Sequence, residues 1–203
     1  LDPKNNKYVF GGNLVTFGKG AEVKTDCSGL LNELLKHSDG FDDARLRKVF
    51  GATRPTAKRY YDAIVSARDF ENIEKVEPII PGDILAIAYI INYKGRATGH
   101  VLLAAGKSQR MEPRNPLVSG TTQFEVTVID SATNAHGPTD TRKGNGEKGA
   151  NTTGIGKGIM RIYADAAGKV AGYTWTTQSS DKGSFYPQED RPMASGRLRA
   201  AKK

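Results

Sequence analysis

The strongest constraint on this chain is that its helix-like patterns precede its strand-like patterns. Between residues 26 and 40, four leucines recur at the spacing of one helix face, and an Asp-Gly pair ends the run. A second helix is expected over 41–51, with acidic residues in its first turn and Gly51 after its end. A third is expected over 55–70, with Pro55 near the first helical position.

From residue 81 onward the pattern is that of β-strands. Residues 81–106 predict two strands with a glycine-containing connection, residues 124–132 alternate as one strand, and residues 159–177 predict a hairpin that turns at 166–169. We expect the polar, glycine-rich stretch 133–158 to be a loop, flexible over 144–158. The segment 185–203 is expected to be an ordered return with a frayed end. Helices followed by an antiparallel sheet predict an α+β fold, with N-terminal helices packed on the sheet.

Length and composition favour one domain and exclude several classes of protein. A chain of 203 residues suits a single domain over 1–203, which we expect to be a monomer. The longest apolar run, 84–91, is too short to span a membrane, because a spanning helix needs roughly 20 residues. A net charge of +8 favours an anionic partner such as bacterial cell wall. The basic residues form no continuous stripe and no base-reading motif, so we expect no nucleic-acid binding.

The single cysteine, Cys27, lies directly before the leucines of the first helix. One reading is that it is a small buried hydrophobic residue, which is the common fate of a free cysteine. The other is that it is a nucleophile, because the first turn of a helix favours thiolate over thiol. Its polar neighbours Asp26 and Ser28, and its place ahead of the leucine face, favour the nucleophile.

A cysteine nucleophile needs a base, and the chain has three histidines. His37, at the far end of the same helix, is too distant, and His136 lies in a polar loop where an exposed position is expected. His100 begins a predicted strand and can face a helix terminus, although a purely structural histidine is an equal reading. Asp130, at the end of the next strand, is the expected acceptor that orients the imidazole, with Asn134 and His136 as alternatives. Asp83 is expected to serve a turn.

Four short motifs in order carry a family resemblance. They are YVFGG at 8–12, DCSG at 26–29, PGDIL at 81–85 and GHV at 99–101. This set resembles that of the NlpC/P60 cysteine peptidases, and it covers roughly residues 7–132. The resemblance implies a papain-like fold in which a cysteine on a helix packs against a sheet that carries the histidine. Residues 133–203 are then additional strands and loops of the same domain.

The resemblance also implies an activity, which is cleavage of amide bonds in the peptide stems of bacterial peptidoglycan. Cys27 would be the nucleophile and His100 the base, and Asp130 would stand where this family commonly has a histidine. Tyr8, Asp26 and Ser28 are expected to contact the substrate. No cofactor or metal is expected, since the histidines and the cysteine lack zinc-ligand spacing.

Peptidoglycan as substrate implies a secreted or periplasmic protein, whose signal segment would be absent from the printed sequence. Two alternatives stay open. The same cysteine and histidine could serve an acyltransferase or a deamidase acting on another amide, or the chain could be a non-catalytic cell-wall binding module.

Overall fold

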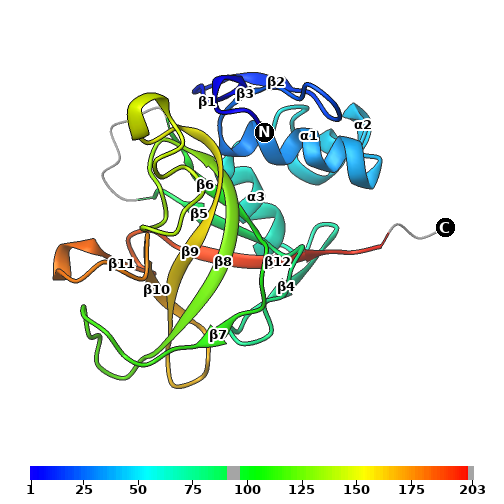
Figure 1. Ribbon diagram of the computed structural model, residues 1–203. Coiled ribbons are helices and arrows are strands. Elements are labelled where there is room, and N and C mark those ends of the chain that lie inside the picture. Colours follow the sequence, from blue (N-terminus) through cyan, green and yellow to red (C-terminus); the bar gives the residue numbers. More distant parts are fainter. Residues whose placement is uncertain (91–96, 201–203) are drawn as a thin grey trace.

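The computed structural model describes residues 1–90 and 97–200. It is an α+β protein with three α-helices in the described part of the chain, all in the first third (Figure 1). They are α1 (Cys27–Asp39), α2 (Asp43–Phe50) and α3 (Ala57–Val65). Three helices are therefore present where they were predicted. The third is shorter than the expected 55–70, because it ends at Val65 and residue 70 already begins a strand.

The described strands form two sheets, of which the small one was not predicted from the sequence. A small sheet has the order β1-β3-β2 and consists of β1 (Asn6–Tyr8), β2 (Asn13–Val15) and β3 (Val23–Thr25). The large antiparallel sheet has the order β11-β10-β9-β8-β6-β5-β12-β4, and β7 pairs with β8 beside it. Its strands are β4 (Phe70–Ile73), β5 (Ile84–Ala88), β6 (Gly99–Ala104), β7 (Gln109–Arg110), β8 (Thr122–Ala132), β9 (Gly154–Ala164), β10 (Val170–Thr174), β11 (Phe185–Pro187) and β12 (Met193–Leu198). Short 3-10 turns occupy Pro3–Asn5, Glu147–Gly149 and Lys182–Ser184.

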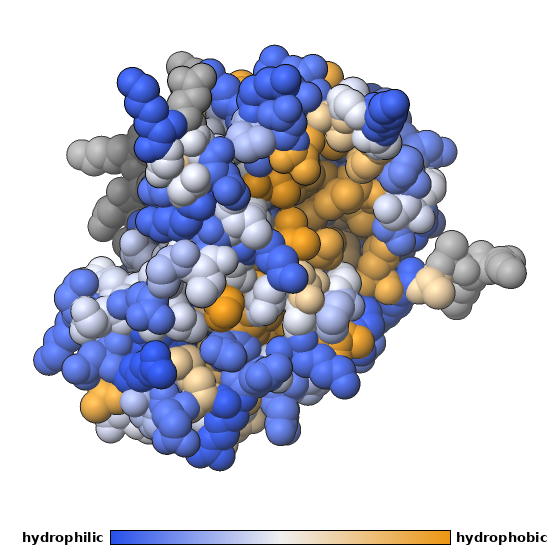
Figure 2. All heavy atoms as spheres, in the orientation of Figure 1, coloured by the Kyte–Doolittle hydropathy of each residue, from blue (hydrophilic) through white to orange (hydrophobic). Residues whose placement is uncertain are grey.

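The central strands bury both of their faces, because a core lies on each side of the sheet. On β6, Val101 joins the cluster that packs under the helices, while Leu102 and Ala104 join a second cluster on the opposite face. The strand β5 is buried along its whole length, which explains its continuous apolar sequence. Figure 2 shows a mostly hydrophilic face with a hollowed apolar area between the N-terminal helices and the sheet.

One prediction about the last third of the chain is wrong. Residues 154–158 are not a flexible loop but the start of β9, which pairs with β8 along eleven residues. The segment after 185 is an ordered return, as expected, and it contains β12, which runs between β5 and β4 inside the large sheet. The expected frayed end at 201–203 lies outside the described residues. The sheet thus combines strands from before and after residue 132 (Figure 1).

The predicted hairpin at 159–177 is confirmed as β9 and β10, and Asp83 serves a turn as expected, since it accepts a hydrogen bond from the backbone of Ile80. The predicted connection between β5 and β6 includes residues 91–96, which lie outside the described residues. In the described part of the chain, no helix is long and apolar enough to cross a membrane.

Candidate active site

Cys27 is the first residue of α1, and Asp26, which joins β3 to this helix, is fixed by hydrogen bonds. Asp26 caps the helix by accepting a hydrogen bond from the backbone of Gly29 at 2.7 Å and another from the hydroxyl of Ser28 at 3.0 Å. Its second oxygen accepts from the backbone of Gly11 at 2.8 Å and from Arg54 at 3.2 Å. Both oxygens of Asp26 are therefore engaged within the protein, and they tie the segment 8–12 to the start of the helix.

His100 and Asp130 lie on the neighbouring strands β6 and β8, which pair in antiparallel register. His100 Nε2 lies 2.6 Å from Asp130 Oδ2. Burial by itself would raise the pKa of Asp130, but hydrogen bonds from His100 and His136 hold this pKa far below its usual range. An ionised carboxylate only accepts hydrogen bonds, so His100 carries a proton on Nε2 and presents Nδ1 to other partners.

The thiol of Cys27 is the other partner of His100. Burial by itself would lower the pKa of His100, but the charge on Cys27 and hydrogen bonds with Asp130 and Cys27 raise the pKa to about 10. At neutral pH the imidazole of His100 is therefore in its doubly protonated, positively charged form beside the sulfur of Cys27. Cys27, His100 and Asp130 form one continuous chain of polar contacts that joins α1 to two strands.

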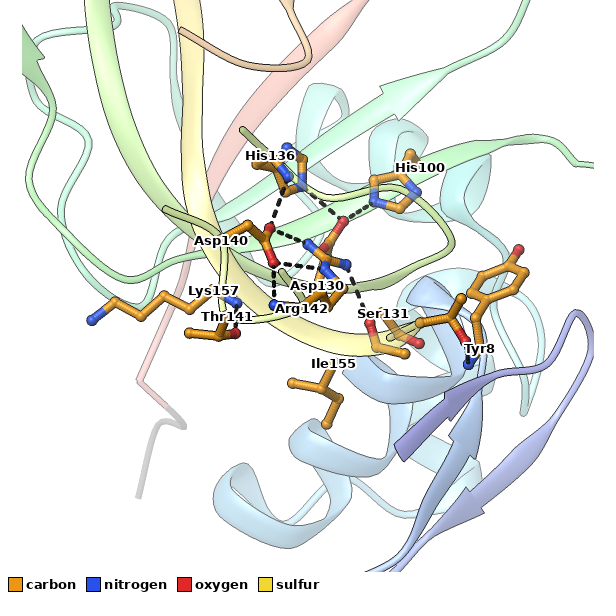
Figure 3. A network of polar contacts seen from close by, with 12 residues as sticks. Tyr8, His100, Asp130, Ser131, His136, Asp140, Thr141, Arg142, Ile155 and Lys157 are labelled. Atoms are coloured by element: carbon orange, nitrogen blue, oxygen red, sulfur yellow. Dashed lines mark hydrogen bonds and ion pairs between the residues drawn. The ribbon is translucent and has the colours of Figure 1, made fainter. Parts of the chain in front are cut away.

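Asp130 has further partners that are buried behind it (Figure 3). His136 Nε2 lies 3.0 Å from the same oxygen that His100 contacts. Arg142 Nη1 lies 2.9 Å from the other oxygen, as an ion pair without the alignment of a hydrogen bond. His136 and Arg142 are both at most 1% exposed, so the expectation of an exposed His136 is wrong. The polar loop folds inward because its charged side chains have partners there.

Both ring nitrogens of His136 lie against oxygen atoms. Its Nδ1 lies 2.7 Å from the backbone carbonyl of Trp175, which can only accept a hydrogen bond. Its Nε2 lies 3.0 Å from Asp130 Oδ2. The ring of His136 is therefore held in place from two sides.

Asp140 completes this network. Arg142 donates to both carboxylate oxygens of Asp140, at 2.9 and 2.7 Å, and the backbone of His136 donates to Asp140 at 2.8 Å. The carboxylates of Asp130 and Asp140 both pair with the guanidinium of Arg142. These charges can be buried because each has an opposite charge beside it and hydrogen bonds within the network.

Glycines in β9 leave room for the network. A Cβ atom on Gly156 would lie 2.2 Å from Arg142 Nε, and one on Gly158 would lie 2.6 Å from an oxygen of Asp140. These glycines belong to the run that the sequence pattern assigned to a flexible loop. Their role is to let the buried side chains approach the strand.

A cavity of about 630 Å³ opens over the chain of contacts. Cys27 and His100 lie in its wall, together with Tyr8 from β1 and Asn134 from the loop after β8. Trp175 contributes an aromatic wall, with its ring stacked on His136 at 4.2 Å and edge-on to His100 at 4.9 Å between ring centroids. The other lining residues are Phe10, Gly11, Asp26, Ser28, Arg54, Thr56, Ala57, Tyr89, Ala97, Thr98, Gly99, Ala132, Thr133, Tyr186 and Arg191.

The chain is 30% identical over 180 residues to an uncharacterized protein of Acanthamoeba polyphaga mimivirus. The matched region covers 86% of this chain and 77% of the viral protein. This chain belongs to the family of that viral protein. The matched region is longer than the motif-bearing part at 7–132, so the family relationship extends into the strands that follow. No family model matches the chain, and no solved structure matches it.

Most of the site residues that were predicted from the sequence of this chain lie close together in the structure. Cys27, His100 and Tyr8 share the cavity wall, and Asp130 lies directly behind His100. Asn134 also lines the cavity, while His136 supports Asp130 from behind. His37 lies elsewhere, exposed and stacked on Phe17.

Sequence reasoning missed Arg142, Trp175 and Arg191, all from the last third of the chain. The only signal for Trp175 was that it is the single tryptophan, and the two arginines carried none. In the described part of the chain, no group of three or more His, Cys, Asp or Glu side chains is arranged to hold a metal ion.

Proposed function

We propose that the protein is a cysteine hydrolase that cleaves amide bonds in the peptide stems of bacterial peptidoglycan. The observation that carries this proposal is the contact chain Cys27–His100–Asp130 at the wall of a cavity of about 630 Å³. A nucleophile, a base and an orienting acid in this order are the arrangement that amide hydrolysis through a covalent intermediate requires.

In the resting enzyme the thiolate of Cys27 is paired with the imidazolium of His100. The raised pKa of His100, about 10, supports this pairing, since the ring holds its proton well above neutral pH. The thiolate attacks the substrate carbonyl and forms a tetrahedral intermediate. His100 then gives its Nδ1 proton to the leaving amine, which departs and leaves a thioester on Cys27.

Water completes the cycle. His100, now neutral, accepts a proton from a water molecule that attacks the thioester, and the acid product leaves as Cys27 regains its negative charge. The backbone N–H groups of Cys27 and Ser28 lie in the first turn of α1, where helical N–H groups have no partner within the helix. They are the candidate donors to the developing oxyanion, with Tyr8, another lining residue, as a second candidate.

The NlpC/P60 resemblance supplies the substrate class and the proposed papain-like arrangement. Three of the four motifs contribute residues to the cavity wall: YVFGG, DCSG and GHV, which contains His100. The fourth, PGDIL, leads into β5, the strand that pairs with the strand of His100. Within this proposal the protein is secreted or periplasmic, because its substrate lies outside the cytoplasm.

The test is mass spectrometry of defined muropeptides incubated with the protein and with Cys27→Ala. We expect fragments of the stem peptide from the unaltered protein and none from the variant. Products that carry an added amine would favour acyl transfer over hydrolysis. Intact muropeptides together with rapid alkylation of Cys27 near neutral pH would show a reactive site with a different substrate, and an inert Cys27 would contradict catalysis.

A further inference from the structure

Arg161 is a buried cation that no acidic side chain neutralises. It lies on β9 and is fully buried. In the part of the chain that the structure describes, no Asp or Glu acts on its guanidinium, and residues 91–96 and 201–203 contain no Asp or Glu. A charge can be buried without an opposite charge only where hydrogen bonds stabilise it instead.

The backbone carbonyls of two separate loops supply those hydrogen bonds. Arg161 Nη1 donates to the carbonyls of Arg114 and Asn115, both at 2.9 Å, in the loop between β7 and β8. Arg161 Nη2 donates to the carbonyl of Thr177 at 2.9 Å and to that of Ser179 at 2.6 Å, in the loop after β10. One guanidinium therefore joins two loops that are far apart in the sequence, and its rigid planar fork suits this role.

The loop after β10 begins with Trp175, whose ring lies in the cavity wall. This ring is stacked on His136 and edge-on to His100. Its indole N–H is buried without a hydrogen-bond partner among the described residues, so no hydrogen bond of the indole fixes the ring. The position of the ring therefore depends on its packing and on the course of the backbone through residues 175–179.

That backbone is anchored at successive carbonyl oxygens. The carbonyl of Trp175 accepts from His136 Nδ1 at 2.7 Å, and the carbonyl of Thr176 accepts from the hydroxyl of Thr174 at 2.8 Å. Arg161 anchors the next part of the loop, at residues 177 and 179. Without the guanidinium these last two carbonyls would lose their donor, and the loop would be held only at its beginning.

We propose that Arg161 is a positioning residue that holds Trp175 against the two histidines and thereby sets the shape of the cavity wall. Arg161 is not a lining residue of the cavity, so it acts through the backbone of residues 177–179. The placement of Trp175 is inferred from contacts alone. Only the consequence for substrate binding rests on the proposed function.

The test uses the fluorescence of Trp175, which is the only tryptophan of the chain and therefore reports on this wall alone. Emission and quenching by acrylamide are measured for the unaltered protein and for Arg161→Met, which keeps a long side chain without a donor. We expect emission at longer wavelength in the variant. The quenching constant should rise about twofold or more, because the loop opens locally to water.

Tyr163→Phe is the matched control. The hydroxyl of Tyr163 accepts from Arg161 Nη1 at 3.1 Å and donates to the carbonyl of Pro116 at 2.8 Å, so it belongs to the same cluster but holds the other loop. We expect this variant to keep the Trp175 emission and quenching of the unaltered protein, even where its Tm is lower.

Arg161→Lys is the conservative variant. Its ammonium keeps the charge but lacks the fork that reaches both loops, so we expect it to restore only part of the protection of Trp175 from acrylamide. Circular dichroism shows which variants are folded. If Arg161→Met does not fold, Arg161→Lys is compared with Tyr163→Phe in its place.

Kinetics with a muropeptide that the unaltered protein cleaves extend the test to the substrate. We expect KM to rise several-fold in the folded Arg161 variant and kcat to change less, because the altered wall contacts the substrate while Cys27, His100 and Asp130 keep one another as partners. An unchanged KM beside an exposed Trp175 would overturn the link between this wall and substrate binding.

Unchanged emission and quenching in a folded Arg161 variant, or an equal change in Tyr163→Phe, would overturn the positioning role. The proposed function fails separately. If Trp175 becomes exposed in the Arg161 variant but the unaltered protein cleaves no muropeptide, then Arg161 positions the wall of a cavity that serves another substrate.

Discussion

His136 Nε2 lies 3.0 Å from Asp130 Oδ2, the oxygen that also contacts the candidate catalytic histidine at 2.6 Å. One carboxylate thus accepts hydrogen bonds from two imidazoles that come from different parts of the chain. Arg142 is paired with its other oxygen. Asp130 is therefore held ionised and fixed in direction, and these are the two properties that the orienting member of a catalytic triad needs.

Asp130→Asn tests the orienting role. An amide keeps the shape of the side chain but loses the charge, so we expect kcat to fall by on the order of 10³–10⁴-fold with a much smaller change in KM. The pKa of His100 is raised to about 10 in part by Asp130, so the alkaline limb of the kcat/KM profile should lie near pH 10 and move to lower pH in the variant. An unchanged profile would mean that Asp130 does not act on His100.

The same carboxylate makes stability depend on acid. The folded-state pKa of Asp130 lies well below the unfolded value of about 3.9, so its stabilising contribution is present above that value and is lost as the pH falls through the acid range. Urea unfolding measured between roughly pH 6 and pH 3 should show a decreasing free energy of unfolding, with a shallower slope in Asp130→Asn. Glu112→Gln, at an exposed position, is the control and should keep the original slope.

The hydrogen bond of His136 Nδ1 can be observed directly. This nitrogen lies 2.7 Å from the backbone carbonyl of Trp175, which only accepts, so ¹⁵N NMR should show a proton on Nδ1 of His136. Exposed His37, assigned through His37→Gln, gives the reference spectrum for a solvated imidazole. An Nδ1 without a proton would contradict the hydrogen bond from His136 to Trp175.

Arg142→Met should destabilise the protein strongly. The substitution keeps a long side chain but leaves Asp130 and Asp140 with one fewer cation in a buried site, and breaking such a pair typically costs about 3–5 kcal/mol. Chemical denaturation measures the loss. Arg197→Met removes a partly exposed pair with Asp83 and should cost clearly less, so equal losses in the two variants would contradict the importance of burial.

Gly158→Ala tests the packing of the network against β9. The added methyl group would lie 2.6 Å from an Asp140 oxygen and 2.7 Å from the Cβ of His136, and overpacking of this kind typically costs about 1–3 kcal/mol. Thermal unfolding should show a lower midpoint for this variant than for Lys157→Ala, a change at the exposed neighbouring position of the same strand. Equal midpoints would mean that the network shifts without cost.

Sequence patterns predicted the first half of this protein well, because the information there is local. The leucine spacing after Cys27 and the glycine after residue 39 specify one helix and its ends through short-range backbone preferences. The alternation that ends at Asp130 specifies a strand in the same way. With the cysteine at a helix start and His100 at the beginning of a neighbouring strand, the three residues could be named in advance.

The rest depended on contacts between distant segments. Residues 154–158 pair with β8, and β12 pairs with strands more than a hundred residues earlier, yet neither segment has a periodic pattern of its own. From the sequence, His136 and Arg142 are expected in a solvent-exposed loop because both are polar. Their burial can be predicted only when the opposite charges that lie beside them in the fold are known. The sequence by itself determined the helices, the position of the large sheet's strands after them in the chain, and the identity of the candidate nucleophile and base. It did not indicate the small sheet of β1, β2 and β3 that precedes the helices. Only the tertiary structure decided which polar residues are buried, because burial of a charge requires a partner that the fold brings from elsewhere in the chain.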